Sequence, residues 1–196
     1  MTGGRAGTLR MKTIHDGVNG TFRLLAAFGC LWLAACTGIP ENATAVRDFD
    51  LDRYLGTWYE IARLDHRFER GLSRNQAHYS LRDDGGVRVV NKGYDAESGE
   101  WKTAEGKAYF VEQPDIGRLK VSFFGPIYGS YNIIELDEAD YSYAMVVGAD
   151  TSYLWILARE PRLDQAIVDR LVAKAKSLGF PTGKLIYPDQ DAGAGS

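Results

Sequence analysis

The fold is decided by one stretch in the first half of the chain, Tyr54-Leu55-Gly56-Thr57-Trp58-Tyr59-Glu60-Ile61-Ala62-Arg63. A run of aromatic and β-branched residues that opens on a glycine is typical of the first strand of an antiparallel β protein. Gly56 allows a sharp backbone turn, and Trp58 follows two residues later on one face of the pleat. A tryptophan here is equally consistent with an ordinary core residue, so the interpretation depends on the stretches that follow.

Seven more strand-like runs follow this stretch, with turn signals between them. The clearest turn signal is Asp83-Asp84-Gly85-Gly86, between the second and third strands. Eight strands at this spacing predict a β-sandwich or an up-and-down β-barrel. The seven runs cover residues 76–81, 87–94, 101–111, 118–124, 128–136, 141–147 and 153–159.

The chain changes to helical periodicity after the last strand. Residues 163–178 carry one apolar stripe, Gly179 stands where a C-terminal cap belongs, and Pro181 prevents continuation. The stripe predicts a helix packed on the outside of the barrel, and docking of the same stripe on a membrane is the alternative. A short last strand is expected over 184–187. The stripe consists of Ile167, Leu171, Ala175 and Leu178.

The bulk composition suits one soluble domain with a core of its own. The chain has 196 residues, of which 45% are hydrophobic and 25% charged, and its formal charge is −3. An aromatic content of 12% together with 22 glycines favours β structure over helix. Both cysteines, Cys30 and Cys36, precede the first strand, which excludes a disulfide framework within the fold.

The N-terminal part indicates a signal peptide. Arg23 is followed by an apolar run of 12 residues, 24–35, which is too short to cross a bilayer comfortably. A buried helix is the alternative interpretation. The run ends in Leu33-Ala34-Ala35-Cys36, which resembles a bacterial lipobox and implies cleavage before Cys36 and a lipid on its thiol. Because Thr37 rather than aspartate follows, the resemblance implies sorting to the periplasmic face of the outer membrane.

Removal of residues 1–35 makes the chain more acidic. That segment holds four basic residues and one acidic residue, which leaves 19 Lys and Arg against 25 Asp and Glu, or a net charge of −6. Such a domain is poorly suited to bind nucleic acid. Its long leader leaves both Met1 and Met11 as candidate starts. The expected plan is a lipoprotein signal peptide over 1–35, a lipidated tether over 36–48, a barrel domain over 49–190 and a flexible tail over 191–196.

Several short motifs now point to one family. Gly56-Thr57-Trp58-Tyr59-Glu60 opens the first strand, Asp140-Tyr141 precedes the seventh, and Arg159 ends the eighth. With these motifs, with Phe68-Glu69-Arg70-Gly71 and with residues 120–126, the chain resembles the lipocalin family, specifically its bacterial outer-membrane lipoproteins. The resemblance covers about residues 49–187. It implies an all-β fold, an eight-stranded antiparallel up-and-down β-barrel with one C-terminal α-helix packed outside.

In an up-and-down barrel every other turn lies at the same end. Counting strands places Arg159 beside Trp58, where a guanidinium over an indole contributes ~0.5–2 kcal/mol. We expect these two residues and Gly56 to form a structural barrel floor. At the open end, Arg67 and Arg70 rim an apolar mouth, which suits an amphiphile with an anionic head or is simply a solvated loop with ion pairs. The open-end loops are 65–74, 95–100, 125–129 and 149–152.

Alternation along the strands predicts which side chains line the interior. Counting from Trp58 turns Glu60 and Ala62 inward. A buried glutamate needs a hydrogen-bond partner or a shifted pKa, so Glu60 contacts a ligand or belongs to an internal network. Ala104, Gly106 and Ala108 share a face with Phe110 and leave room for a ligand if they point inward. The full candidate ligand-binding set is Glu60, Ala62, Arg67, Phe68, Arg70, Trp101, Phe110, Phe124, Tyr128, Tyr153, Trp155 and Leu157.

The resemblance implies a function in lipid binding. Bacterial lipocalins are associated with fatty acids, such as palmitate, and with lysophospholipids, which they bind or carry in the cell envelope. Burial of an acyl chain contributes ~0.8 kcal/mol per methylene, enough for useful affinity without an elaborate polar site. The alternative is a structural envelope lipoprotein with a filled barrel and no transported ligand. Aromatic side chains around the mouth are also consistent with a homodimer contact.

The sequence carries no motif of a known catalytic centre. The part after residue 35 has two histidines, His66 and His78, and contains no HExxH, CxxC or GxSxG pattern and no phosphate-binding glycine loop. We therefore expect no enzymatic activity, no metal site and no cofactor.

Overall fold

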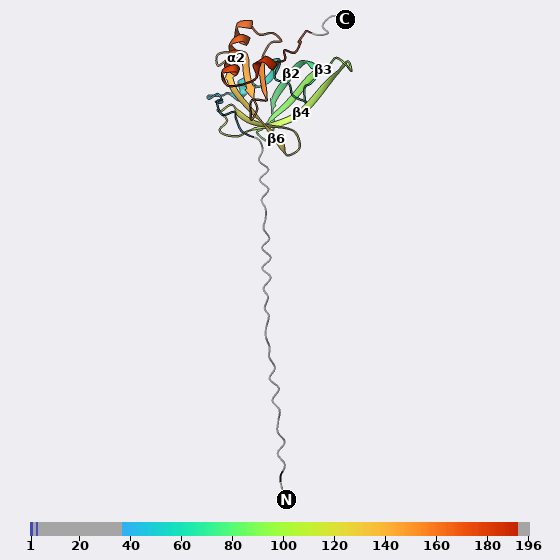
Figure 1. Cartoon of the computed structure of the whole chain (residues 1–196), viewed down its shortest axis with the longest axis vertical. Helices are drawn as coiled ribbons and strands as arrows, with labels where there is room; N and C mark the ends of the chain where they lie inside the picture. Colours follow the sequence, from blue (N-terminus) through green and yellow to red (C-terminus); the bar gives the residue numbers. More distant parts are fainter. Residues whose placement is uncertain (2, 4–36, 192–196) are drawn as a thin grey trace. The chain divides into compact units, whose positions relative to one another are not determined.

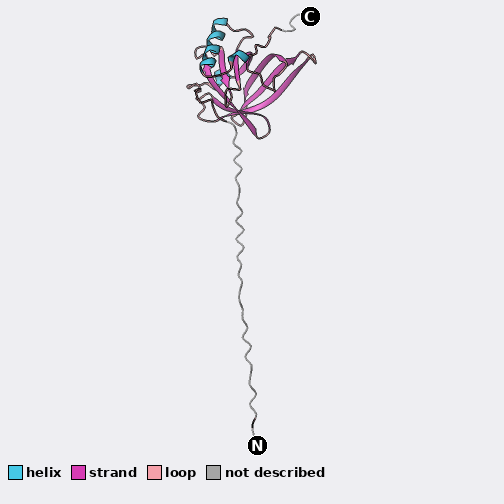
Figure 2. Ribbon diagram, viewed as in Figure 1, coloured by secondary structure: helices cyan, strands magenta, loops and turns pink. Residues whose placement is uncertain are grey.

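The computed structural model of the chain describes residues 1, 3 and 37–191. Cys36, most of the predicted signal peptide and residues 192–196 of the predicted tail lie outside these residues. Within the described part, eight strands form one closed antiparallel barrel in which each strand pairs with the next and β8 pairs with β1 (Figures 1 and 2). No helix in this part is long and apolar enough to span a membrane.

The predicted eight-stranded up-and-down barrel is confirmed. The second strand begins at Leu72 rather than at residue 76, because alternation fails there: Arg74 has a φ of 50° and the register against the third strand shifts between Ser73 and Gln76. The strands are β1 (Gly56–Arg63), β2 (Leu72–Leu81), β3 (Val87–Asp95), β4 (Glu100–Phe110), β5 (Arg118–Phe124), β6 (Ile127–Leu136), β7 (Tyr143–Val147) and β8 (Leu154–Ala158).

The helix α2 (Gln165–Ser177) packs on the outside of the barrel, as predicted (Figure 1). Its stripe residues Leu171 and Ala175 are fully buried, in one cluster with the outward-facing Met145 of β7 and Ile156 of β8. The apolar stripe is therefore covered by the barrel. This contact excludes the alternative in which the same stripe docks on a membrane.

One end of the barrel, called the closed end here, is covered by the short helix α1 (Leu51–Tyr54). Trp58 is fully buried there, and its Nε1 donates a hydrogen bond to the carbonyl oxygen of Tyr54 at 2.8 Å. The guanidinium carbon of Arg159 lies 4.0 Å from the centroid of the indole of Trp58. The same guanidinium donates to the carbonyl oxygens of Arg53, Leu55 and Thr57, at 2.6, 2.9 and 3.1 Å.

Residues 37–48, which the sequence predicts to be part of a lipidated tether, run against the barrel wall. Val46 donates to the carbonyl oxygen of Ile133 and accepts from the amide of Gly117, both at 2.9 Å. Ala43 is buried in the cluster beneath α2. The segment is held by scattered backbone hydrogen bonds rather than by a regular ladder, which explains why its sequence has no periodicity.

The short strand expected over 184–187 is reduced to one bridge. A 3-10 turn, η1 (Thr182–Lys184), comes first. Ile186 then exchanges two backbone hydrogen bonds with Arg63 at the open end of β1, at 2.9 and 2.8 Å. Proline and glycine on both sides prevent a longer ladder, since Pro188 has no amide hydrogen to donate.

We predict that Arg159→Ala lowers the free energy of unfolding by about 2–3 kcal/mol, because the cation–π contact is lost and backbone carbonyl groups lose their donor. Urea denaturation followed by circular dichroism measures this change. Arg162→Ala is the matched control, since that arginine is exposed and its ion pair among the described residues is with Asp191. An equal shift of the midpoint in both variants contradicts the role given to Arg159.

Candidate functional site

A β-bulge in β1 determines which side chains enter the barrel. The register of β1 against β8 shifts between Glu60 and Ala62. The extra residue leaves Ile61 and Ala62 together on the outer face, in the cluster beneath α2, and it turns Arg63 inward. The inward position predicted for Ala62 is therefore wrong. Simple alternation also missed Arg63, because it assumes an unbroken period of two.

Arg63 is neutralised by partners inside the barrel. Its side chain is buried, with 1% of the residue exposed. Its Nη1 donates to Oε1 of Glu60 at 2.9 Å and its Nη2 donates to the carbonyl oxygen of Glu69 at 2.8 Å. Oε2 of Glu69 accepts a hydrogen bond from Nε1 of Trp155 at 3.2 Å and lies 3.0 Å from Nε2 of His66. One network thus joins β1, the segment after it and β8.

The two carboxyl groups of this network have pKa values shifted in opposite directions. Burial raises the pKa of Glu60 well above its ordinary value, and the charge of Glu69 adds to this rise while Arg63 opposes it. Burial alone would also raise the pKa of Glu69, but the hydrogen bond and charge of His66, with hydrogen bonds from Glu60 and Trp155, lower it. The opposite directions of the two pKa shifts favour a proton on Glu60 and a charge on Glu69.

A cavity of about 100 Å³ lies inside the barrel and is bounded on one side by this network. Its wall combines polar residues with a larger apolar surface. Oδ1 of Asn75 and Oδ1 of Asn91 are buried and accept no hydrogen bond from the described residues. The polar lining residues are Glu60, Glu69, Asn75, Gln76, Asn91 and Ser130, and the apolar ones are Ala77, Tyr79, Val89, Val121, Phe123, Tyr131, Trp155 and Leu157.

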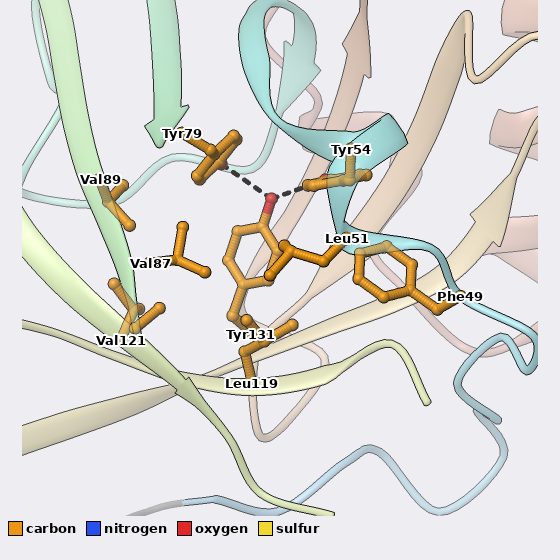
Figure 3. A pocket seen from close by; sticks show the side chains of 10 residues that line it. Phe49, Leu51, Tyr54, Tyr79, Val87, Val89, Leu119, Val121 and Tyr131 are labelled. Carbon is orange, nitrogen blue, oxygen red and sulfur yellow. Dashed lines mark hydrogen bonds between the residues drawn. The ribbon is translucent and has the colours of Figure 1, made fainter. Parts of the chain in front are cut away.

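A second void of about 20 Å³ lies toward the closed end (Figure 3). Tyr79 and Tyr131 line both voids and so form a wall that the two share. The hydroxyl of Tyr131 lies 2.8 Å from the hydroxyls of both Tyr54 and Tyr79 (Figure 3). Burial raises the pKa of all three tyrosines, so each hydroxyl keeps its proton at neutral pH. This tyrosine trio marks the bottom of the larger cavity.

The room expected from small residues of β4 is largely taken by a neighbour. A Cβ atom on Gly106 would lie 2.6 Å from the carbonyl oxygen of Ser122 and 2.8 Å from the ring of Phe123. The ring of Phe123 therefore occupies the space that the glycine leaves. Ala108 is buried and lines the smaller void, whereas Ala104 is exposed on the hairpin of β3 and β4, which extends beyond the rest of the barrel (Figure 1).

The open end of the barrel carries the turns after β1, β3, β5 and β7. Phe68 and Phe124 are exposed on two of these turns. The ring of Tyr153 stacks on that of Trp155, with centroids 6.1 Å apart, so these two predicted residues link the rim to the cavity wall. Leu157, also predicted, lines the cavity directly.

The two arginines predicted for the rim differ in their partners. Arg70 forms an ion pair with Asp65 at 2.7 Å. The guanidinium of Arg67 lies 4.9 Å from the ring centroid of Phe68. Neither arginine lines the cavity. Both remain at the rim, where they can meet a headgroup but not the buried part of a ligand.

Three other predicted residues lie away from the cavity. Trp101 is 48% exposed on the extended hairpin. Phe110 packs edge-on against Phe49 at the closed end, with ring centroids 6.2 Å apart. Tyr128 lies on the outer face, its ring centroid 6.4 Å from that of Tyr109. None of the described residues forms a group of three or more side chains suited to hold a metal ion.

The C-terminal segment 186–190 completes the barrel wall where β1 and β2 separate. Regular pairing of these strands ends at Tyr59, opposite Gln76. Beyond that point β1 pairs instead with the segment, through the bridge between Arg63 and Ile186.

Two further contacts fix this segment to both strands. The amide of Arg74 in β2 donates to the carbonyl oxygen of Asp189 at 3.0 Å. Nε2 of Gln190 donates to the carbonyl oxygens of Glu60 and Asn75, at 2.7 and 3.1 Å. Beyond the short strand expected over 184–187, this role could not be predicted, because the segment contributes through isolated hydrogen bonds and not through a strand pattern.

A closed eight-stranded barrel, sealed at one end and hollow near the other, with one helix packed outside, defines a class of small-ligand-binding β-barrels. A family model described as a lipocalin-like domain matches residues 49–190. The chain belongs to the lipocalin family.

Characterised relatives agree with this assignment. "Outer membrane lipoprotein Blc" of Vibrio cholerae is 56% identical over 158 residues, which cover 81% of this chain and 92% of that protein. The protein of the same name from Escherichia coli (strain K12) is 51% identical, over 84% of this chain and 94% of its own. Among solved structures, insecticyanin from the tobacco hornworm Manduca sexta has a TM-score of 0.61 at 23% identity, over 78% of this chain and 86% of its own, and supports the fold alone.

We predict that Glu60→Gln keeps or raises the thermal midpoint at pH 7, and that its advantage over the native chain grows as the pH rises from about 4.5. The folded chain holds Glu60 protonated where the unfolded chain releases the proton, so this group makes folding less favourable with rising pH. Glutamine preserves a donor toward Glu69 and an acceptor for Arg63 but does not ionise. Melting curves between pH 4 and pH 8 measure the difference.

Glu60→Leu is the control for this prediction. It removes one hydrogen-bond acceptor of the buried guanidinium of Arg63, which typically costs about 1.5–3 kcal/mol. Equal losses of stability in the glutamine and leucine variants at pH 7 show that Glu60 is ionised in the folded chain and contradict the assignment.

We also predict that deletion of residues 186–196 speeds amide hydrogen exchange at Arg63 and Arg74 at least tenfold, because these amides donate to Ile186 and Asp189. The amide of Leu64, which donates to Leu154 in β8 at 3.0 Å, is the internal control and keeps its protection. Unchanged exchange at Arg63 and Arg74 means that the segment does not support this wall.

Proposed function

We propose that this lipocalin binds a single-chain lipid in the bacterial envelope, and that a lysophospholipid suits the cavity better than a fatty acid. The observation that carries the proposal is the interior cavity, which combines an apolar lower wall with a polar rim rich in hydrogen-bond acceptors. The hydrocarbon tail of a lipid matches the apolar lower wall, and a headgroup with hydrogen-bond donors matches the polar rim.

The apolar wall supports binding of a hydrocarbon tail. A dry cavity of about 150 Å³ holds a benzene molecule, so 100 Å³ receives the end of an acyl chain. Each buried methylene contributes ~0.8 kcal/mol. Phe123 and Trp155 border the cavity and are only partly buried, so a rotamer change of either ring lengthens the space for a tail.

The polar rim favours one headgroup over another. The carboxylate of a fatty acid would meet ionised Glu69 in a site of low dielectric, which is repulsive. The free hydroxyl of a lysophospholipid instead donates to the unpartnered oxygens of Asn75 or Asn91. Its phosphate then reaches the rim near Arg67, whose recorded contact is with the ring of Phe68.

The envelope location follows from two lines of support. The relatives of highest identity quoted above carry the name outer membrane lipoprotein. Residues 33–36 resemble a lipobox, so Cys36 is the proposed lipidation site and residues 1–35 the proposed signal peptide. Binding to the periplasmic face of the outer membrane through this lipid is part of the same proposal.

A structural lipoprotein with a filled barrel is the second candidate. The small size of the cavity favours it, since pockets for drug-sized ligands usually measure about 300–1,000 Å³. Ligand binding, rather than the fold, separates the two candidates.

We predict that the protein purified without detergent carries a single-chain lipid detectable by mass spectrometry after solvent extraction. It also binds a 16-carbon lysophosphatidylethanolamine more tightly than palmitate in calorimetric titrations. Ala77→Phe fills the cavity and lowers affinity at least tenfold, whereas Ala104→Phe makes the same change at an exposed position and has no effect. Absence of saturable binding to either lipid supports the structural lipoprotein instead.

A further inference from the structure

The N-terminal end of the described barrel unit is fastened to the middle of the barrel wall, at Asn132 of β6. Nδ2 of Asn132 donates to the carbonyl oxygen of Gly38 at 3.0 Å and to that of Gly148, in the turn after β7, also at 3.0 Å. A Cβ atom on Gly38 would lie 3.7 Å from the carbonyl oxygen of Ala149, an ordinary van der Waals contact. Gly38 therefore lies against a turn that belongs to the open end.

Very little chain separates this attachment from Cys36. Nη2 of Arg118 donates to the carbonyl oxygen of Thr37 at 2.9 Å, and consecutive Cα atoms are about 3.8 Å apart. The inference rests on the proposed lipidation of Cys36. A lipid on that residue enters a bilayer within a few ångströms of the wall near the turn after β7, so the barrel cannot turn freely above the membrane.

The turns of the open end expose large apolar side chains. Phe68 is 56% exposed after β1, and Phe124 and Ile127 are 68% and 74% exposed on either side of the turn between β5 and β6. That turn, Gly125-Pro126, carries no charged residue. Such a set of apolar side chains around one rim is typical of a surface that contacts a partner or a lipid phase.

The closed end has the opposite character. Its three turns, residues 82–86, 111–117 and 137–142, hold seven carboxylates against one basic residue, Arg82. The four open-end turns, residues 64–71, 96–99, 125–126 and 148–153, hold four carboxylates against two arginines, so the open end is less acidic. Anionic lipid headgroups therefore repel the closed end more strongly than the open end. Charge and apolar exposure thus favour the same orientation.

We infer that the open end of the barrel docks on the lipid bilayer, with Phe68, Phe124 and Ile127 among the headgroups and the acidic closed end directed away from the membrane. In this orientation the rim of the cavity lies at the level from which a single-chain lipid leaves the leaflet. The lipid enters the cavity tail first without crossing open water.

The test compares two fluorophore positions on the full lipidated chain reconstituted in vesicles that contain a headgroup spin-labelled lipid. Ile127→Cys places the fluorophore at the open end. Leu81→Cys is the matched control, an exposed leucine at the end of β2 next to the closed-end turn 82–86. We expect at least threefold stronger quenching at position 127 than at position 81. Equal quenching, or stronger quenching at position 81, overturns the inference.

Two further measurements keep the outcome unambiguous. If the chain does not float with vesicles, Cys36 is not lipidated. The orientation is then tested with a chain in which six histidines replace residues 1–36. Nickel-chelating lipid holds this chain on the vesicle from the same attachment point. A second copy of the chain covers the rim if two results coincide. Cysteines at position 127 of two copies cross-link, and the fluorophore at position 127 is shielded from solvent equally with and without vesicles. This outcome refutes docking of the open end on the bilayer. Ligand titration in solution is independent of both results.

Discussion

The burial of Arg63 is the constraint on which the interior of this barrel depends. A guanidinium at 1% exposure is tolerated only when charged and hydrogen-bonding partners replace water. Glu60 provides one partner from the same strand, and Glu69 provides another from the segment after it. If that segment moves away, Arg63 loses its hydrogen bond to the carbonyl oxygen of Glu69. The network therefore fixes one wall of the cavity and one turn of the open end in a single arrangement.

The structural features that depend on a regular hydrophobic period or on paired sequence motifs could be predicted from the sequence. The eight strands and the outer helix follow from periods of 2 and 3.6, and strand counting alone brings Arg159 next to Trp58. Glu60 was expected to need a buried partner or a shifted pKa, and it has both. These features depend on the local pattern of apolar residues and on the order of the strands along the chain. In a closed up-and-down barrel, that order determines which strands are neighbours.

The rest depends on irregularities that leave no periodic trace. One extra residue in β1 moves Ala62 outward and Arg63 inward, and this exchange decides the chemistry of the cavity. The segments 37–48 and 186–190 are held by isolated backbone hydrogen bonds, so their composition suggested a tether and a short strand. Gly106 predicted free space, but only the neighbouring strand reveals that Phe123 fills it.

The cavity can lengthen in three directions, and their costs differ. Displacing the tyrosine trio breaks two hydrogen bonds, on the order of 2–4 kcal/mol, which three to five further methylenes offset at ~0.8 kcal/mol each. Opening the wall at 186–190 breaks backbone and side-chain hydrogen bonds to β1 and β2, and it exposes the interior of the barrel to water. Moving Glu69 breaks its hydrogen bonds with Arg63 and Trp155, and no additional burial compensates for their loss. Under the proposed lipid binding, a longer tail therefore extends the cavity toward the closed end, past Tyr131 into the smaller void, and the length of that path limits the length of the bound chain.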